Sequence, residues 1–106
     1  QKMELKVYWL ELAEIKLRNI YNYYLIKAGK PVAEKLINGI VVTTIGIGKQ
    51  PEIGQIESSL ENRKQEFRYL VYKNYKIVYW VNYDYERVEI ANVFDTRQNP
   101  IKIEET

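Results

Sequence analysis

The sequence predicts an α+β domain, in which an N-terminal strand is followed by a two-helix hairpin and then by an antiparallel three-stranded meander. Apolar residues alternate with polar ones at the start of the chain, recur at helical spacing through its middle, and form three closely spaced β-rich segments near its end. The chain has 106 residues, the size of one domain. We therefore expect a single domain over residues 1–106, with residues 101–106 as a tail and the hairpin covering one face of the sheet.

The first strand is predicted over residues 3–9. Its odd-numbered residues are apolar, whereas Glu4, Lys6 and Tyr8 occupy the other side. An alternation of period two is typical of a strand with one face in water.

Two helices are predicted over residues 10–28 and 31–44. Gly29 is a natural helix end, and Pro31 is a natural first-turn residue of the next helix. Residues 40–45 are rich in β-branched side chains, which favours a strand, but the helical start at Pro31 favours a helix to about Thr44. The glycines and proline of residues 46–64 then predict a long loop with a short helical turn at residues 56–60.

Three strands are predicted over residues 66–72, 74–82 and 87–95. The first two are joined by a tight turn at residues 73–74, and the short connections imply an antiparallel meander. In the last strand the even-numbered residues from Val88 to Phe94 are expected on one face, and the odd-numbered residues on the other. Several tyrosines and both tryptophans, Trp9 and Trp80, are expected to pack in the core or at the sheet edge.

The composition excludes several kinds of chemistry. The chain has no cysteine and no histidine, which excludes disulfide scaffolds, thiol nucleophiles, Ser-His-Asp catalysis and sites ligated by Cys or His. Residues 46–49 lack the spacing of a phosphate-binding loop, and no carboxylates show metal-ligand spacing. We expect no metal and no cofactor. The longest uncharged run, residues 36–48, is far shorter than a membrane span of about 20 residues, so we expect no membrane partner and a cytoplasmic location.

Residues 62–76 form a basic block in a chain of formal net charge +2. Five Lys and Arg residues stand there against one Glu, and they are interleaved with aromatic side chains, which suits a surface for phosphates and bases. A strand with a basic solvent face explains the pattern equally well. If the chain cleaves RNA, a lysine or tyrosine must act as the base and an arginine must stabilise the transition state. The candidates are Arg68, Lys76 and Arg97, because three adjacent strands could bring them together.

Nearly the whole chain, from about Glu4 to Pro100, resembles the RelE/ParE superfamily of toxins. The resemblance rests on Arg68 with Leu70, on residues 74–79 (NYKIVY), on residues 88–90 and on residues 93–100 (VFDTRQNP), and the strand and helical hairpin follow the same order. It implies a growth-inhibiting toxin of a type II toxin–antitoxin, or plasmid stabilisation, system, with a cognate antitoxin protein as its partner. RelE-like members cut mRNA on the ribosome, whereas ParE-like members block DNA gyrase.

The residues resemble ParE-like members more closely than RelE-like ones. Arg97 matches an arginine that RelE-like nucleases place on the phosphate, but Lys76 stands where they carry a second arginine, so the bidentate fork is lost. Their lysine pair maps to Phe67 and Tyr69, with Arg68 close by, and their C-terminal tyrosine has no counterpart.

Two functions from different classes follow. The first is a toxin that binds a target such as gyrase through basic residues; the second is a ribosome-dependent endoribonuclease that uses Arg97, Lys76 and Arg68. A third possibility is a family member that no longer harms its host. For Arg97, the alternative to a role in a functional site is a plain ion pair with Asp95 or with the acidic residues of the tail. The residues expected to bind the target are Arg97, Arg68, Lys76, Lys64 and Arg63.

Overall fold

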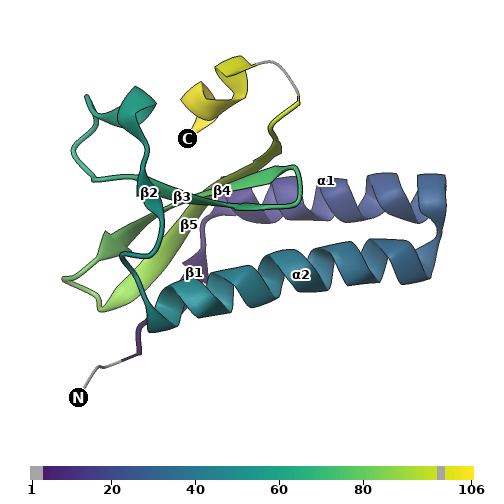
Figure 1. Cartoon of the computed structure of the whole chain (residues 1–106), viewed down its shortest axis with the longest axis horizontal. Helices are drawn as coiled ribbons and strands as arrows, with labels where there is room; N and C mark the ends of the chain where they lie inside the picture. Colours follow the sequence, from purple (N-terminus) through teal and green to yellow (C-terminus); the bar gives the residue numbers. More distant parts are fainter. Residues whose placement is uncertain (1–3, 98–99) are drawn as a thin grey trace.

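The computed structural model describes residues 4–97 and 100–106, and it confirms the α+β prediction (Figure 1). A five-stranded sheet has the order β1-β5-β4-β3-β2, and two long helices pack against one of its faces. The elements are β1 (Lys6–Trp9), α1 (Glu11–Ala28), α2 (Lys30–Lys49), β2 (Gln55–Ile56), η1 (Ser58–Leu60), β3 (Arg68–Tyr72), β4 (Tyr75–Asn82), β5 (Arg87–Asp95) and η2 (Pro100–Glu105).

The predicted meander is present as β3, β4 and β5, which pair antiparallel. The predicted loop contains a strand that was not predicted, the two-residue β2, which pairs with β3. β1 pairs parallel to β5, because the helical hairpin carries the chain back across the sheet before the meander begins. The first residue of the predicted first strand, Met3, lies outside the described residues.

The predicted end of the second helix at Thr44 is wrong, since α2 continues through Gly46 and Gly48 to Lys49. Ile40, Thr44 and Ile47 on this helix are buried, and this packing outweighs both the β-branched propensity and the glycines. Gly48 also has a packing reason: a Cβ there would lie 2.6 Å from the Leu5 carbonyl oxygen. Residues 46–49 are therefore helix, and the loop is shorter than predicted.

The predicted faces of the last strand hold only up to Ile90. Tyr79 pairs with Ile90 while Val78 pairs with Asn92, so Ala91 is an extra residue in β5. A β-bulge of this kind reverses the alternation that follows it. As a result Val93 packs on the helix side, whereas Phe94 packs on the opposite side.

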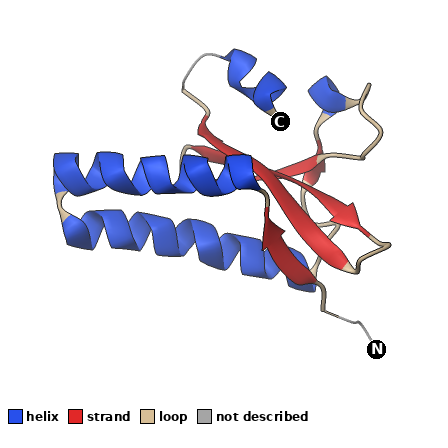
Figure 2. Cartoon of the chain, turned by 180° about the vertical axis from the view of Figure 1, so that it is seen from behind, coloured by secondary structure: helices blue, strands red, loops and turns tan. Residues whose placement is uncertain are grey.

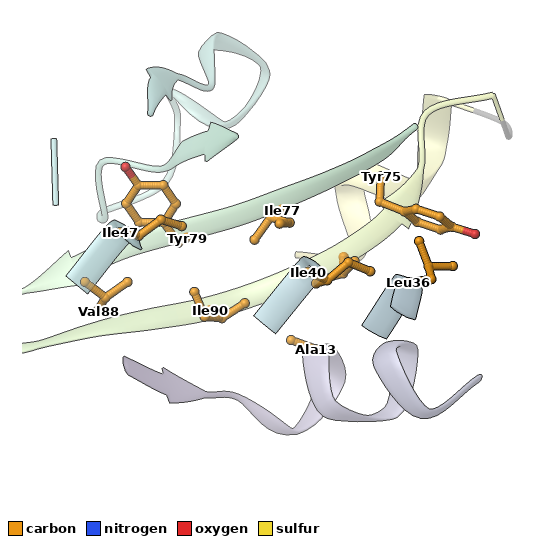
Figure 3. Close-up of a cluster of buried hydrophobic side chains, with 10 residues drawn as sticks. Ala13, Leu36, Ile40, Ile47, Tyr75, Ile77, Tyr79, Val88 and Ile90 are labelled. Carbon is orange, nitrogen blue, oxygen red and sulfur yellow. The ribbon is translucent and has the colours of Figure 1, made fainter. Parts of the chain in front are cut away.

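Two cores lie on the two faces of the sheet. The larger core, between the sheet and the helices, contains the side chains drawn in Figure 3, among them Tyr75 and Tyr79. The smaller one contains Leu60, Phe67, Val78, Ala91 and Phe94, beneath η1 and η2. Both predicted aromatic anchors are partly buried: Trp9 packs on the larger core and Trp80 on the smaller one.

Residues 101–106 include most of η2, which packs against β5. The buried Asn92 side chain donates hydrogen bonds to the Lys102 carbonyl (3.3 Å) and to Thr106 Oγ1 (3.0 Å). A salt bridge of 2.6 Å from Lys16 to Glu105 ties η2 to α1. Within the described residues, neither α1 nor α2 is long and apolar enough to cross a membrane.

Candidate functional site

Arg97 follows the end of β5 and forms a bidentate ion pair with Asp95. Its Nη2 lies 2.8 Å from Oδ2 and its Nε lies 3.1 Å from Oδ1, while its backbone N–H also donates to Oδ1. The Arg97 hydrogen bonds lower the pKa of Asp95 to about 2, and the same contact raises the pKa of Arg97. The Arg97 side chain is nevertheless 68% exposed, so it remains accessible to a partner.

A cleft of about 390 Å³ lies beside this ion pair, between α1, β5 and η2. Its floor is aromatic, and the hydroxyls of Tyr24 and Tyr75 are 3.3 Å apart there. Lys16, Arg97 and Lys102 contribute three cations to its walls. Two of these cations are already paired, with Glu105 and Asp95 respectively.

Lys76 projects from β4 on the face of the sheet opposite the helices, because it alternates with Tyr75 and Ile77 of the larger core. Its ammonium pairs with the buried carboxylate of Glu57 and lies 4.1 Å from the ring centroid of Tyr69. Burial alone would raise the pKa of Glu57, but hydrogen bonds from Lys76 and Ser59 and the charge of Lys76 hold this pKa below its usual value. The charge of Lys76 is therefore already paired with a carboxylate of the protein itself.

Arg68 lies on the helix side of the sheet, opposite Tyr79 in the β3–β4 register. Its Nη1 donates to the carbonyls of Glu52 (3.3 Å) and Gly54 (2.9 Å). The buried hydroxyl of Tyr79 donates to the Pro51 carbonyl (2.7 Å) and accepts from the Gly54 N–H (2.9 Å). Together the two side chains fix the loop that follows α2.

Arg63 and Lys64 lie in the loop after η1. Arg63 donates from Nη1 to the Thr106 carbonyl (2.5 Å) and from Nη2 to the Glu104 carbonyl (3.4 Å), so it holds η2. Lys64 is exposed at the rim of a depression of about 280 Å³.

The structure therefore does not bring the three nuclease candidates together. Arg68 lies by the loop on the helix side, Lys76 lies on the opposite face, and Arg97 lies beyond the end of β5 beside α1. Each guanidinium or ammonium is already bound to a carboxylate or to carbonyl oxygens. Buried tyrosines do not supply the missing base, because burial raises the pKa of Tyr75 and of Tyr79.

Two arrangements in the structure were not predicted from the sequence. Glu57 is not among the predicted site residues, and its partnership with Lys76 depends on how the 57–67 loop folds over the sheet. Arg87 was not singled out, although its guanidinium lies between the rings of Tyr8 and Tyr85. No local signal joins Tyr8 to Arg87, because they meet only through the parallel pairing of β1 with β5.

No three His, Cys, Asp or Glu side chains in residues 4–97 and 100–106 come together as a group that could hold a metal ion.

Comparisons with known proteins agree with this architecture. Residues 7–100 match a family model described as the ParE toxin of a type II toxin–antitoxin system, parDE. A solved structure titled "Chromosomal ParDE TA system from P. aeruginosa" aligns with a TM-score of 0.70 and 17% sequence identity, covering 87% of this chain and 96% of that one. At this identity the structural likeness supports the fold. No curated protein sequence matches the chain.

Proposed function

Because the chain belongs to the ParE toxin family of type II toxin–antitoxin systems, we propose that it inhibits growth by binding a macromolecular target such as DNA gyrase. It breaks no bond itself. A toxin of this family works with a cognate antitoxin, which we expect as the second partner, in the cytoplasm where both partners are made. Such a pair would serve plasmid stabilisation if its genes lie on a plasmid.

The observation that carries this proposal is the separation of Arg68, Lys76 and Arg97. RNA cleavage needs a base, an acid and a cation within hydrogen-bond reach of one phosphate. These three side chains belong to three different surroundings, and their charges are engaged by the protein itself. Binding makes no such demand, since an exposed arginine such as Arg97 can contribute to an interface alone.

The cations support binding in different ways. Lys64 is exposed and available to a target directly, and Arg97 is exposed beside its ion pair with Asp95, where a target can contact it. Arg63 holds η2 in place, and Arg68 holds the loop after α2. We therefore expect substitution of either residue to lower the stability of the fold more than the affinity for the target.

Ribosome-dependent mRNA cleavage is the second candidate. Lys76 over the Tyr69 ring places a cation and an aromatic side chain on one sheet face, a combination that suits a stacked base and its phosphate. Glu57 occupies that cation in the free protein. Cleavage would therefore require the substrate to displace Glu57.

Purified protein tests the two candidates side by side. One assay follows DNA supercoiling by gyrase, and the other follows mRNA integrity on programmed ribosomes. We expect the protein to inhibit supercoiling and to leave the mRNA intact. The Arg97→Ala variant should keep its fold and inhibit supercoiling more weakly. If the wild-type protein cleaves the mRNA and the Lys76→Ala, Arg97→Ala double variant does not, the protein is a nuclease and the proposal is wrong.

A further inference from the structure

The turn between β4 and β5, residues 83–86, presents the two most exposed aromatic side chains among the described residues. Tyr83 is 68% exposed and Tyr85 is 72% exposed. Figure 2 shows this turn at the end of the sheet that lies far from the tip of the helical hairpin. Large apolar side chains that gather in water at one place are typical of an interaction surface.

Arg87, which follows this turn, is held between two aromatic rings on the face of the sheet away from the helices. Its guanidinium carbon lies 4.2 Å from the ring centroid of Tyr8 and 5.2 Å from that of Tyr85. Its Nε donates to Glu89 at 2.8 Å. In the described part of the chain its two terminal nitrogens make no hydrogen bond, so the outer half of the guanidinium is available.

A network of buried polar groups fixes the turn and the arginine together. The backbone N–H of Tyr85 donates to Asn82 Oδ1 (3.2 Å), and Asn82 Nδ2 donates to the Glu89 carboxylate (2.8 Å), which also accepts from Arg87. Glu86 closes the turn at φ 52, in the left-handed region that a residue with a side chain rarely adopts. The positions of Tyr85 and Arg87 are therefore set before any partner arrives.

The stability of the fold is a weak reason for such a network. Glu89 is only 4% exposed, and burying a charge costs free energy even when the charge is paired. Apolar side chains of similar volume are often equally stable in such a place. A fixed surface gains in binding instead, because fewer side chains have to be ordered when the partner docks.

We propose that residues 83–87 form a contact surface for the protein target of the toxin, and that Arg87 binds an acidic side chain of that target. A planar guanidinium with its outer nitrogens unpaired matches a carboxylate. The exposed carboxylates next to it, Asp84 and Glu86, form no salt bridge with Arg87 in the part of the chain that the structure describes. Tyrosine and arginine are also the side chains that most often dominate protein interfaces. This inference rests on the proposed function, since it assumes a target that the toxin binds.

This surface is separate from the cleft beside Arg97. Arg87 is the first residue of β5 and Asp95, the partner of Arg97, is the last, so the length of the strand places them about 25 Å apart. A target that contacts both arginines must span the sheet from one end to the other.

Supercoiling assays with purified gyrase test the surface through two pairs of variants. Tyr85→Ala removes the exposed ring, with Tyr85→Phe as its control, and Arg87→Gln removes the charge, with Arg18→Gln as its control. Arg18 is exposed on α1, on the other side of the sheet. We expect Tyr85→Ala and Arg87→Gln to need about tenfold more protein than the wild type for half-inhibition, and both controls to stay within about twofold.

The outcomes separate this inference from the proposed function. Inhibition by both test variants at the wild-type level overturns this inference and leaves the proposed function standing, whereas a wild-type protein that does not inhibit supercoiling overturns both. If only Tyr85→Ala weakens inhibition, the acidic contact at Arg87 is wrong. If Arg87→Gln fails to fold, Tyr85→Ala, whose change lies at the surface, decides whether the turn contacts the target.

Binding of the variants to gyrase without DNA identifies the source of the anion. A loss of affinity in the absence of DNA supports a carboxylate of the target. A loss that occurs only when DNA is present overturns the proposed contact in favour of a DNA phosphate.

Discussion

Replacing Tyr79 with phenylalanine should lower the free energy of unfolding by about 2–4 kcal/mol, although it removes one oxygen atom. The Tyr79 hydroxyl donates to the Pro51 carbonyl at 2.7 Å and accepts from the Gly54 N–H at 2.9 Å. Tyr79 is fully buried and Gly54 is buried too, so water cannot replace the lost partner at that N–H. Two hydrogen bonds at about 0.5–1.5 kcal/mol each, plus about 1 kcal/mol for the unsatisfied buried donor, give this range.

Urea denaturation followed by tryptophan fluorescence measures the change, with Tyr69→Phe as the control. The Tyr69 hydroxyl makes one exposed hydrogen bond, to Gln55 at 3.0 Å, so its removal should cost less than about 0.5 kcal/mol. For a domain of this size the Tyr79→Phe loss corresponds to roughly 10–20 °C in Tm. A loss below about 0.5 kcal/mol for Tyr79→Phe would refute the view that this hydroxyl holds the loop after α2.

Two further predictions concern α2 and the Arg97 ion pair. Gly39→Ala should destabilise the fold by about 1–3 kcal/mol, because a Cβ there would lie 2.0 Å from the Tyr72 hydroxyl. Gly46→Ala should stabilise the fold by about 0.5–1 kcal/mol, because nothing lies within 4 Å of a Cβ at that position. Thermal unfolding of both variants checks the two predictions, and equal changes in stability would contradict them. The low pKa of Asp95, about 2, contributes stability that is present above about pH 4 and is lost as the pH falls toward 2. Because the Arg97 partner is exposed, we expect this contribution to the free energy of unfolding to be at most about 1 kcal/mol and to be reduced by salt. The contribution should be absent in Asp95→Asn. If stability falls with decreasing pH in Asp95→Asn as it does in the wild type, the prediction is contradicted.

The sequence predicted the elements whose signals are local. The bounds of β5, Arg87–Asp95, match the prediction, because β-branched residues and a turn define them within the segment itself. The end of α2 could not be found in this way, since Gly48 is kept in the helix by its contact with Leu5, a residue far away in the chain. The bulge at Ala91 likewise depends on how β5 meets β4.

The candidate site illustrates the same limit. Arg68, Lys76 and Arg97 lie on neighbouring strands or at their ends, which made a common site reasonable. The turn at residues 73–74 pairs Arg68 with Tyr79 and Val71 with Lys76, and this register puts Arg68 and Lys76 on opposite faces of the sheet. The partners that engage them, the Gly54 carbonyl and Glu57, belong to the irregular segment after α2, whose path no local pattern predicts.

The central claim is that this toxin acts by binding its target and not by cutting RNA. The most direct measurement is to induce the protein alone in bacteria and to follow labelled thymidine and labelled methionine incorporation during the first minutes. We predict that thymidine incorporation falls first, and that the Lys76→Ala, Arg97→Ala double variant weakens the effect in proportion to its lost affinity. An early fall in methionine incorporation that the double variant abolishes, while antitoxin binding is retained, would contradict the claim and establish the nuclease.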